Sequence, residues 1–205
     1  MEKKIEQLSS LLEDPARPFT LVVGGAKMGE KIGFLEYVIP RVDRVLIGGG
    51  VAATFLKSEG CGVGISAVEY DKVDLVRTIL QKAKDFNVRV RLPMDVVATE
   101  KIESGATDRI VSAGQIPADL MIADIGPRTI EEFVKELKIC RTVGWNGPLG
   151  VFEIPQFSEG TRSIATVLSG LNATTVIGGR SAVGVCREDD AYLYGRWCIS
   201  PVFIW

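Results

Sequence analysis

The sequence predicts an α/β protein: a three-layer α/β/α domain around a six-stranded, mainly parallel sheet. Short β-branched or apolar runs alternate along the chain with segments whose apolar residues recur at helical spacing. The apolar runs leave no face for water, which is typical of parallel strands covered by helices on both sides. A length of 205 residues, 46% hydrophobic and 24% charged, is enough for one such domain.

Six runs rich in Val, Ile, Leu or Thr are predicted as strands, at residues 19–23, 44–47, 88–92, 120–123, 141–145 and 174–177. Helical spacing predicts helices at residues 5–12, 33–39, 51–57, 71–85, 129–138 and 161–169. In the clearest of them, TIEEFVKELK, Thr129 is expected to cap the helix and Glu132 to complete a capping box. Its buried stripe is Ile130, Phe133, Val134 and Leu137.

Composition excludes several classes of protein. A net charge of −2 argues against nucleic acid and anionic membranes as partners, and no apolar run is long enough to span a bilayer. A cytoplasmic location is expected, because the N-terminus lacks an apolar signal core and the four cysteines show no CxxC spacing. The chain contains no histidine, which rules out Ser-His-Asp chemistry and histidine-bound metals.

Glycine-rich or otherwise tight turns follow nearly every predicted strand: GGAK, GGG, PMD, DIGP, NGPLG and GG. In open parallel sheets ligands bind at the carboxyl ends of strands, where glycine lets the backbone approach a ligand. The alternative for any one turn is that strand-to-helix turns commonly contain glycine. Together the turns predict a Rossmann-like ligand-binding edge.

The first turn, VVGGAKMGEKIG, leads from a strand into a helix, so its amides and helix dipole are expected to attract an anion beside Lys27 and Lys31. Neither common phosphate fingerprint is complete. Ala26 breaks GxGxxG, and Glu30-Lys31 stands where a Walker loop has Lys-Ser/Thr. The alternative is that both lysines are solvated surface residues.

The fifth turn, WNGPLGVFE, places Asn146 and backbone amides where they could face a phosphate, with Glu153 accepting from a ribose hydroxyl. The alternative is a Pro-Gly turn, and for Trp145 packing in the core is favoured. Asp95 and Asp124, at strand ends, are either general bases or helix caps, and we favour caps.

The ordered segments RPFTLVVGGAKMGEKIG, VDRVLIGGGVAATFLKSEG, LPMDVVA, DIGPRTIEEF, VGWNGPLGVFE, FSEGT and VIGG resemble the C-terminal, nucleotide-binding domain of phosphoglycerate kinase. The resemblance implies phosphoryl transfer between 1,3-bisphosphoglycerate and ADP, giving 3-phosphoglycerate and MgATP in glycolysis. It also implies that Lys27 and Lys31 contact the nucleotide phosphates and the transferring group. The adenine site would be lined by Gly25, Gly49, Gly50 and Ile122, the phosphates and base bordered by Asn146, Pro148 and Gly150, and the ribose held by Glu153.

Two departures from the family concern substrate and metal. The chain begins where the family's second domain begins, so we expect the 3-phosphoglycerate site to be missing and the isolated chain to bind nucleotide at most, without turnover. The family's last nucleotide loop, GGGD followed by Ser or Thr, corresponds here to Gly178, Gly179, Arg180 and Ser181. Arg180 replaces the carboxylate expected on Mg²⁺ and cannot ligate it, so no metal ligand is assigned.

The third departure is the tail. Residues 1–185 are expected to form the nucleotide-binding domain, and residues 186–205 a divergent hydrophobic tail prone to self-association. A permitted back-translation of the tail, read one base later, contains TGGGASL, close to the family's closing loop STGGGASL. We therefore hypothesise a frameshift near Cys186; the alternative is a genuine divergent C-terminus.

Two other functions are alternatives to this one. One is a non-catalytic binding or regulatory module that engages a partner through the aromatic tail. The other is a nicotinamide-dependent oxidoreductase, against which the missing GxGxxG and the intact WNGPLGVFE argue.

Overall fold

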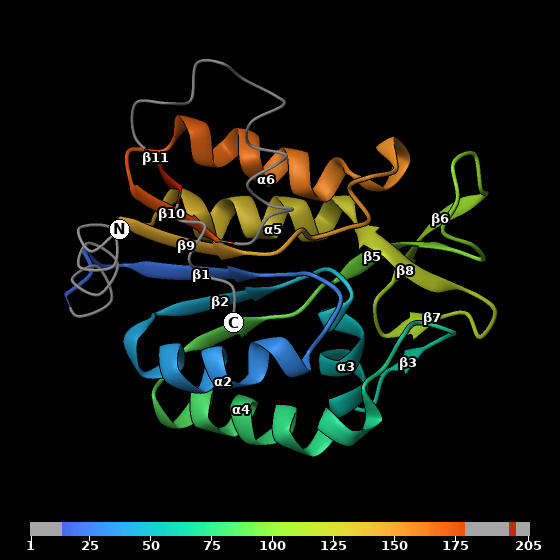
Figure 1. The fold of residues 1–205 in the computed structure, drawn as a ribbon, viewed down its shortest axis with the longest axis horizontal. Helices are drawn as coiled ribbons and strands as arrows, with labels where there is room; N and C mark the ends of the chain where they lie inside the picture. The colour runs from blue at the N-terminus through green and yellow to red at the C-terminus, as the bar shows by residue number, and fades with distance from the viewer. Residues whose placement is uncertain (1–13, 179–196, 200–205) are drawn as a thin grey trace.

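The computed structural model describes residues 14–178 and 197–199 (Figure 1). Its centre is a six-stranded sheet in the order β11-β10-β9-β1-β2-β4, with every neighbouring pair parallel. The strands are β1 (Phe19–Val23), β2 (Arg44–Ile47), β4 (Arg89–Arg91), β9 (Thr142–Asn146), β10 (Thr174–Gly178) and β11 (Trp197–Ile199). The predicted α/β class and a six-stranded parallel sheet are thereby confirmed, although its sixth strand, β11, is not among the predicted strands.

Helices cover both faces of this sheet, as Figure 1 shows. One face carries α2 (Gly29–Val38), α3 (Val51–Ser58) and α4 (Val73–Asp85), and the other carries α5 (Pro127–Lys138) and α6 (Glu159–Gly170). Short 3₁₀ turns lie at Ile39–Arg41, Tyr70–Lys72 and Pro155–Phe157. Two apolar cores result because alternate side chains of β1 point to opposite faces: Leu21 packs with α2, α3 and α4, and Val22 with α5 and α6. No helix in the described part of the chain is long and apolar enough to cross a membrane.

One predicted strand lies outside the parallel sheet. Residues 121–123 belong to β8 (Met121–Ile125), which pairs antiparallel with β5 (Asp95–Thr99) in a three-stranded sheet ordered β6-β5-β8. Strand β6 is Asp108–Ser112, and β3 (Gly62–Val63) pairs with β7 (Gln115–Ile116) beside it. The expectation that residues 120–123 join the main sheet is wrong, because an apolar run shows that a strand is buried but not which strands flank it.

A carboxylate from β5 caps helix α5. The Asp95 side chain accepts the N–H groups of Arg128 and Thr129, at 3.2 and 2.8 Å, and it is almost fully buried. The cap predicted at Thr129 is wrong, because α5 begins two residues earlier and its N-cap is Gly126. The hydroxyl of Thr129 instead donates to the Asp95 carboxylate at 2.7 Å, and Glu132, rather than closing a capping box, lies 3.8 Å from Arg91.

A second buried carboxylate caps α6. Asp124 of β8 accepts the Gly160 N–H on one oxygen and the Ile125 N–H on the other, both at 2.8 Å. Its side chain is fully buried, and this burial raises the pKa of Asp124 to about 7. Both aspartates therefore act as caps, the role favoured from the sequence.

Replacing Asp95 with Ala is expected to lower the free energy of unfolding by about 2–3 kcal/mol, because the first turn of α5 loses its acceptors inside the protein. Urea denaturation followed by circular dichroism measures the change. Asp119→Ala, at an exposed position without a side-chain partner among the described residues, is the matched control and should shift stability by less than about 0.5 kcal/mol. Equal losses in the two variants would contradict the capping role.

The raised pKa of Asp124 predicts how stability depends on pH. Between the ordinary value of 3.8 and about 7 the folded state binds the proton more tightly than the unfolded chain does, so stability falls as pH rises through this window, by up to about 4 kcal/mol. Asp124→Asn keeps one acceptor oxygen but does not titrate. Its free energy of unfolding should therefore decline less between pH 5 and pH 8 than that of the unsubstituted chain, and parallel curves would refute the assignment.

Candidate functional site

Three glycine-rich turns meet at the carboxyl edge of the parallel sheet. They follow β1, β2 and β9, whose last residues lie level with one another in the strand register. The Gly25 N–H donates to Pro148 O at 2.7 Å, and the Gly49 N–H donates to Leu149 O at 2.9 Å. The chain runs from β1 toward β4 on one side and from β9 toward β11 on the other. The turns therefore lie at the point where strand order reverses, the usual ligand position in open α/β sheets.

The glycines of these turns are required by the close approach of one turn to another. Gly49 has φ +62°, and a Cβ there would lie 2.7 Å from the amide nitrogen of Gly25. Gly147 has φ +87°, and a Cβ there would lie 2.6 Å from the carbonyl oxygen of Gly24. Any larger residue would separate the turns. The glycines thus bring backbone against backbone at this edge.

Lys31 is the cation that the fold directs into this edge. It lies in the first turn of α2, and its Nζ donates to Oδ1 of Asn146, the last residue of β9, at 2.5 Å. Lys31 is half-buried, and burial lowers its pKa from 10.5. Lys31 is therefore not the solvated surface lysine of the alternative interpretation. The one hydrogen-bond partner that its ammonium has among the described residues is the neutral amide of Asn146, so its positive charge remains available to an anion.

Lys27 has a different environment. Its side chain is 74% exposed, and its Nζ lies 3.7 Å from Oε1 of Glu30. The structure therefore does not bring Lys27 to Asn146 beside Lys31. Ala26 and Lys27 are exposed residues, and their backbone N–H groups have no acceptor among the described residues. An approaching anion could accept from these two amides.

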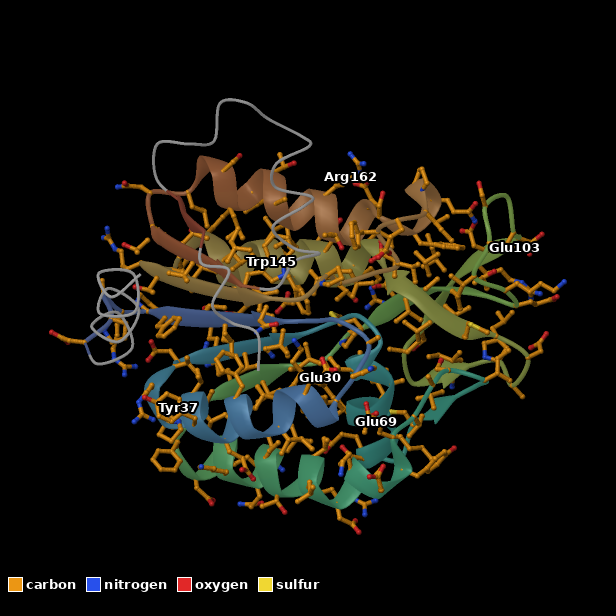
Figure 2. The ribbon with its side chains drawn as sticks, viewed as in Figure 1. Glu30, Tyr37, Glu69, Glu103, Trp145 and Arg162 are labelled. Atoms are coloured by element: carbon orange, nitrogen blue, oxygen red, sulfur yellow. The ribbon has the colours of Figure 1, made fainter. Side chains whose placement is uncertain are left out.

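The first amides of α2 are already occupied. The carboxylate of Glu69, from the loop before α4, accepts the N–H groups of Met28 and Gly29, the latter at 2.9 Å. Figure 2 shows Glu69 and Glu30 near the end of α2 at which the helix begins. The expectation that the amides at the start of α2 are free for an anion is therefore wrong for Met28 and Gly29. No local signal marked Glu69, because it lies forty residues from Gly29 in the chain.

The turn after β9 is packed against β8. A Cβ at Gly150 would lie 2.2 Å from Oδ1 of Asp124, and the Val151 N–H donates to Ala123 O at 2.9 Å. Trp145, labelled in Figure 2, is buried, and its indole N–H donates to Gly147 O at 2.8 Å, so the favoured core role of this residue is confirmed.

The remaining predicted residues are spread around this edge. Ile122 is half-buried in β8, next to Ala123, whose carbonyl accepts the Val151 N–H from the turn after β9. Pro148 and Gly50 are half-buried, whereas Glu153 is exposed and its carboxylate has no partner in the described part of the chain. Gly178 ends β10 directly opposite Asn146.

Several predictions fall on residues that the structure does not describe. Gly179, Arg180 and Ser181 lie outside the described residues, as do the helix predicted at residues 5–12 and the proposed frameshift point at Cys186. Of the tail, the structure describes only the strand Trp197–Ile199. Within residues 14–178 and 197–199, no three side chains of the types that bind metals converge on one point.

Comparison with known proteins assigns the family. The phosphoglycerate kinase family model matches residues 1–191. The chain is 50% identical over 189 residues to the phosphoglycerate kinase of Thermus thermophilus, covering 92% of this chain and 48% of that protein. The chain is 46% identical over 188 residues to the phosphoglycerate kinase of Pelotomaculum thermopropionicum, again covering 92% of this chain and 48% of the relative.

Solved structures agree with the sequence matches. The phosphoglycerate kinase of Coxiella burnetii superposes with a TM-score of 0.92 at 33% identity, covering 98% of this chain and 51% of that one. The phosphoglycerate kinase of Pyrococcus horikoshii superposes with a TM-score of 0.79 at 28% identity, covering 93% of this chain and 48% of that one. The chain spans about half the length of the relatives it matches. The glycine edge, the parallel sheet and these matches agree, and the chain belongs to the phosphoglycerate kinase family.

Proposed function

We propose that this chain forms the nucleotide-binding part of a phosphoglycerate kinase, which moves a phosphoryl group between 1,3-bisphosphoglycerate and ADP to give 3-phosphoglycerate and ATP. The observation that carries the proposal is the half-buried Lys31, directed by α2 toward Asn146 at the switch point of the sheet. Supporting it, half the length of several proteins named phosphoglycerate kinase matches this chain.

In this proposal the nucleotide phosphates lie over the turn after β1. Lys31 and Lys27 supply positive charge, and the backbone N–H groups of Ala26 and Lys27, which have no acceptor among the described residues, supply donors. Phosphoryl transfer depends mainly on positioning and on stabilising charge at the phosphate oxygens. A half-buried ammonium serves this purpose well, because reduced contact with water strengthens its attraction for an anion.

The base and ribose are assigned to the rest of the edge. The backbone at Gly25, Gly49, Gly50, Pro148 and Gly150, together with Ile122, borders the base, and Glu153 accepts a hydrogen bond from a ribose hydroxyl. Support comes from the packing of the three turns and from the exposed carboxylate of Glu153, which has no partner among the described residues.

The residues that the structure describes fit a nucleotide better than a metal. Mg²⁺ prefers carboxylates together with phosphate oxygens, and the described residues bring no such set of side chains together. When bound with the nucleotide, Mg²⁺ neutralises charge on the phosphates. We retain the proposal that Arg180 stands where the family has a metal carboxylate.

Turnover needs an acceptor as well as a nucleotide. In the family, 3-phosphoglycerate is held by the other domain, so we propose that the part of the enzyme described here supplies the nucleotide site and that transfer also needs that domain. Positioning of the two reactants contributes up to roughly 7–11 kcal/mol to such a reaction. A cytoplasmic location accompanies the glycolytic role, and self-association through the tail remains a prediction.

Titration of the chain with MgADP by isothermal calorimetry tests the nucleotide site, with a Kd in the millimolar range or tighter expected. Lys31→Met should weaken binding of both MgADP and magnesium pyrophosphate by about tenfold or more, because a charged hydrogen bond to phosphate is lost. Lys138→Met, at an exposed position in the last turn of α5, is the control and should leave both affinities unchanged. Absence of any heat of binding up to millimolar MgADP would overturn the proposed function.

A second substitution separates the ribose from the phosphates. Glu153→Gln should weaken MgADP binding by about threefold to tenfold, through loss of a charged acceptor, while magnesium pyrophosphate binds as before. Glu131→Gln, an equivalent change on the exposed face of α5, serves as the control. Equal weakening of both ligands by Glu153→Gln would rule out the ribose role.

A further inference from the structure

Glu69 links the start of α2 to the start of α4. The N-cap residue of α2, Met28, offers no side-chain cap, and its own side chain is fully buried. The Glu69 carboxylate provides the missing acceptors by binding the N–H groups of Met28 and Gly29. A carboxylate in this position satisfies two donors and also interacts favourably with the helix dipole.

Glu69 is itself held on both sides. Its N–H donates to Oγ1 of Thr54 at 3.2 Å, and its carbonyl accepts the Lys72 N–H at 2.9 Å. Thr54 is buried in α3, the helix that begins directly after the glycine turn of β2. Glu69 therefore connects the beginning of α2 to the segment that forms the neighbouring part of the glycine edge.

The position of Lys31 depends on the same turn of α2. The Lys31 N–H donates to Met28 O at 2.8 Å, so Lys31 lies in the turn whose first two amides Glu69 holds. Helix α2 has only 10 residues, and a helix of that length is marginal without support at its ends. If the first turn frays or rotates, Nζ of Lys31 leaves Asn146.

We propose that Glu69 is a positioning residue of the nucleotide site: it fixes the first turn of α2 so that Lys31 faces Asn146, and it keeps the amides of Met28 and Gly29 from binding phosphate. The inference rests on the function proposed above. It assigns the phosphates to the lysines and to the backbone N–H groups of Ala26 and Lys27, rather than to the N-terminus of α2.

If Glu69 acted only through its negative charge, removing that charge would change the affinity for nucleotide in the opposite direction. Loss of a negative charge near a phosphate site strengthens anion binding, whereas loss of positioning weakens it. The sign of the change in affinity for Glu69→Gln therefore separates the two roles.

The test compares Glu69→Gln with Glu36→Gln, which makes the same change of charge at an exposed position later in α2. For Glu69→Gln we expect MgADP to bind about tenfold more weakly, and AMP less than about twofold more weakly, because only the contact with the outer phosphate is lost. Glu36→Gln should change neither affinity. Tighter binding of MgADP, or equal weakening of MgADP and AMP, would overturn the proposal.

A readout independent of nucleotide keeps this test separate from the proposed function. In the chain with ¹³C-labelled lysine and ¹⁵N-labelled asparagine, NMR follows the titration of Lys31 and the side-chain amide of Asn146. Glu69→Gln should move the Lys31 pKa back toward the ordinary lysine value and shift the Asn146 signal. If Glu69→Gln leaves the Lys31 and Asn146 signals unchanged, the positioning role of Glu69 is refuted. If the signals change as expected but the unsubstituted chain does not bind MgADP, only the proposed nucleotide site is refuted.

A milder variant covers the case in which Glu69→Gln does not fold. Thr54→Val removes the hydroxyl that holds the Glu69 N–H and leaves the carboxylate in place. It should move the Lys31 and Asn146 signals in the same direction by a smaller amount, and no movement would count against the proposal.

Discussion

The backbone hydrogen bonds that join the three glycine turns are the constraint on which the candidate site depends. Because the Gly25 N–H reaches Pro148 O and the Gly49 N–H reaches Leu149 O, the segments after β1, β2 and β9 lie against one another without side chains between them. This contact sets where α2 and α3 begin. Lys31 reaches Asn146 because α2 starts this close to the end of β9.

Buried or partly buried carboxylates from other parts of the chain complete this arrangement. None of the helices α2, α5 and α6 is capped by the side chain of its own N-cap residue. Each receives a carboxylate from elsewhere: α2 from Glu69, α5 from Asp95 and α6 from Asp124. A cap of this kind ties a helix to another element as well as satisfying its free amides, so helix ends and sheet edge are positioned together. For Asp124 the accompanying burial raises the pKa and makes this link sensitive to pH.

Local sequence and distant contacts contributed differently to what could be predicted. Alternating apolar runs predicted the parallel sheet, and the order of the glycine motifs indicated the family, because both signals lie within short stretches of chain. The same signals misplaced residues 120–123, since β8 is as apolar as a strand of the main sheet but pairs with β5. They also placed a cap at Thr129, where a polar residue precedes an apolar stripe, although the true cap comes from Asp95 across thirty-four positions.

By itself, the sequence determined the α/β class, the glycine edge and the resemblance to phosphoglycerate kinase. It also determined five strands of the parallel sheet, namely β1, β2, β4, β9 and β10. Periodicity, turn chemistry and motif order are properties of neighbouring residues, so they can be recognised before folding is known. Only the tertiary structure decided that Lys31 and Lys27 have different environments and that Glu69 occupies the first amides of α2. It also decided that the described strands are divided among three sheets. Each of these depends on residues far apart in the chain, whose contact is set by the packing of whole elements.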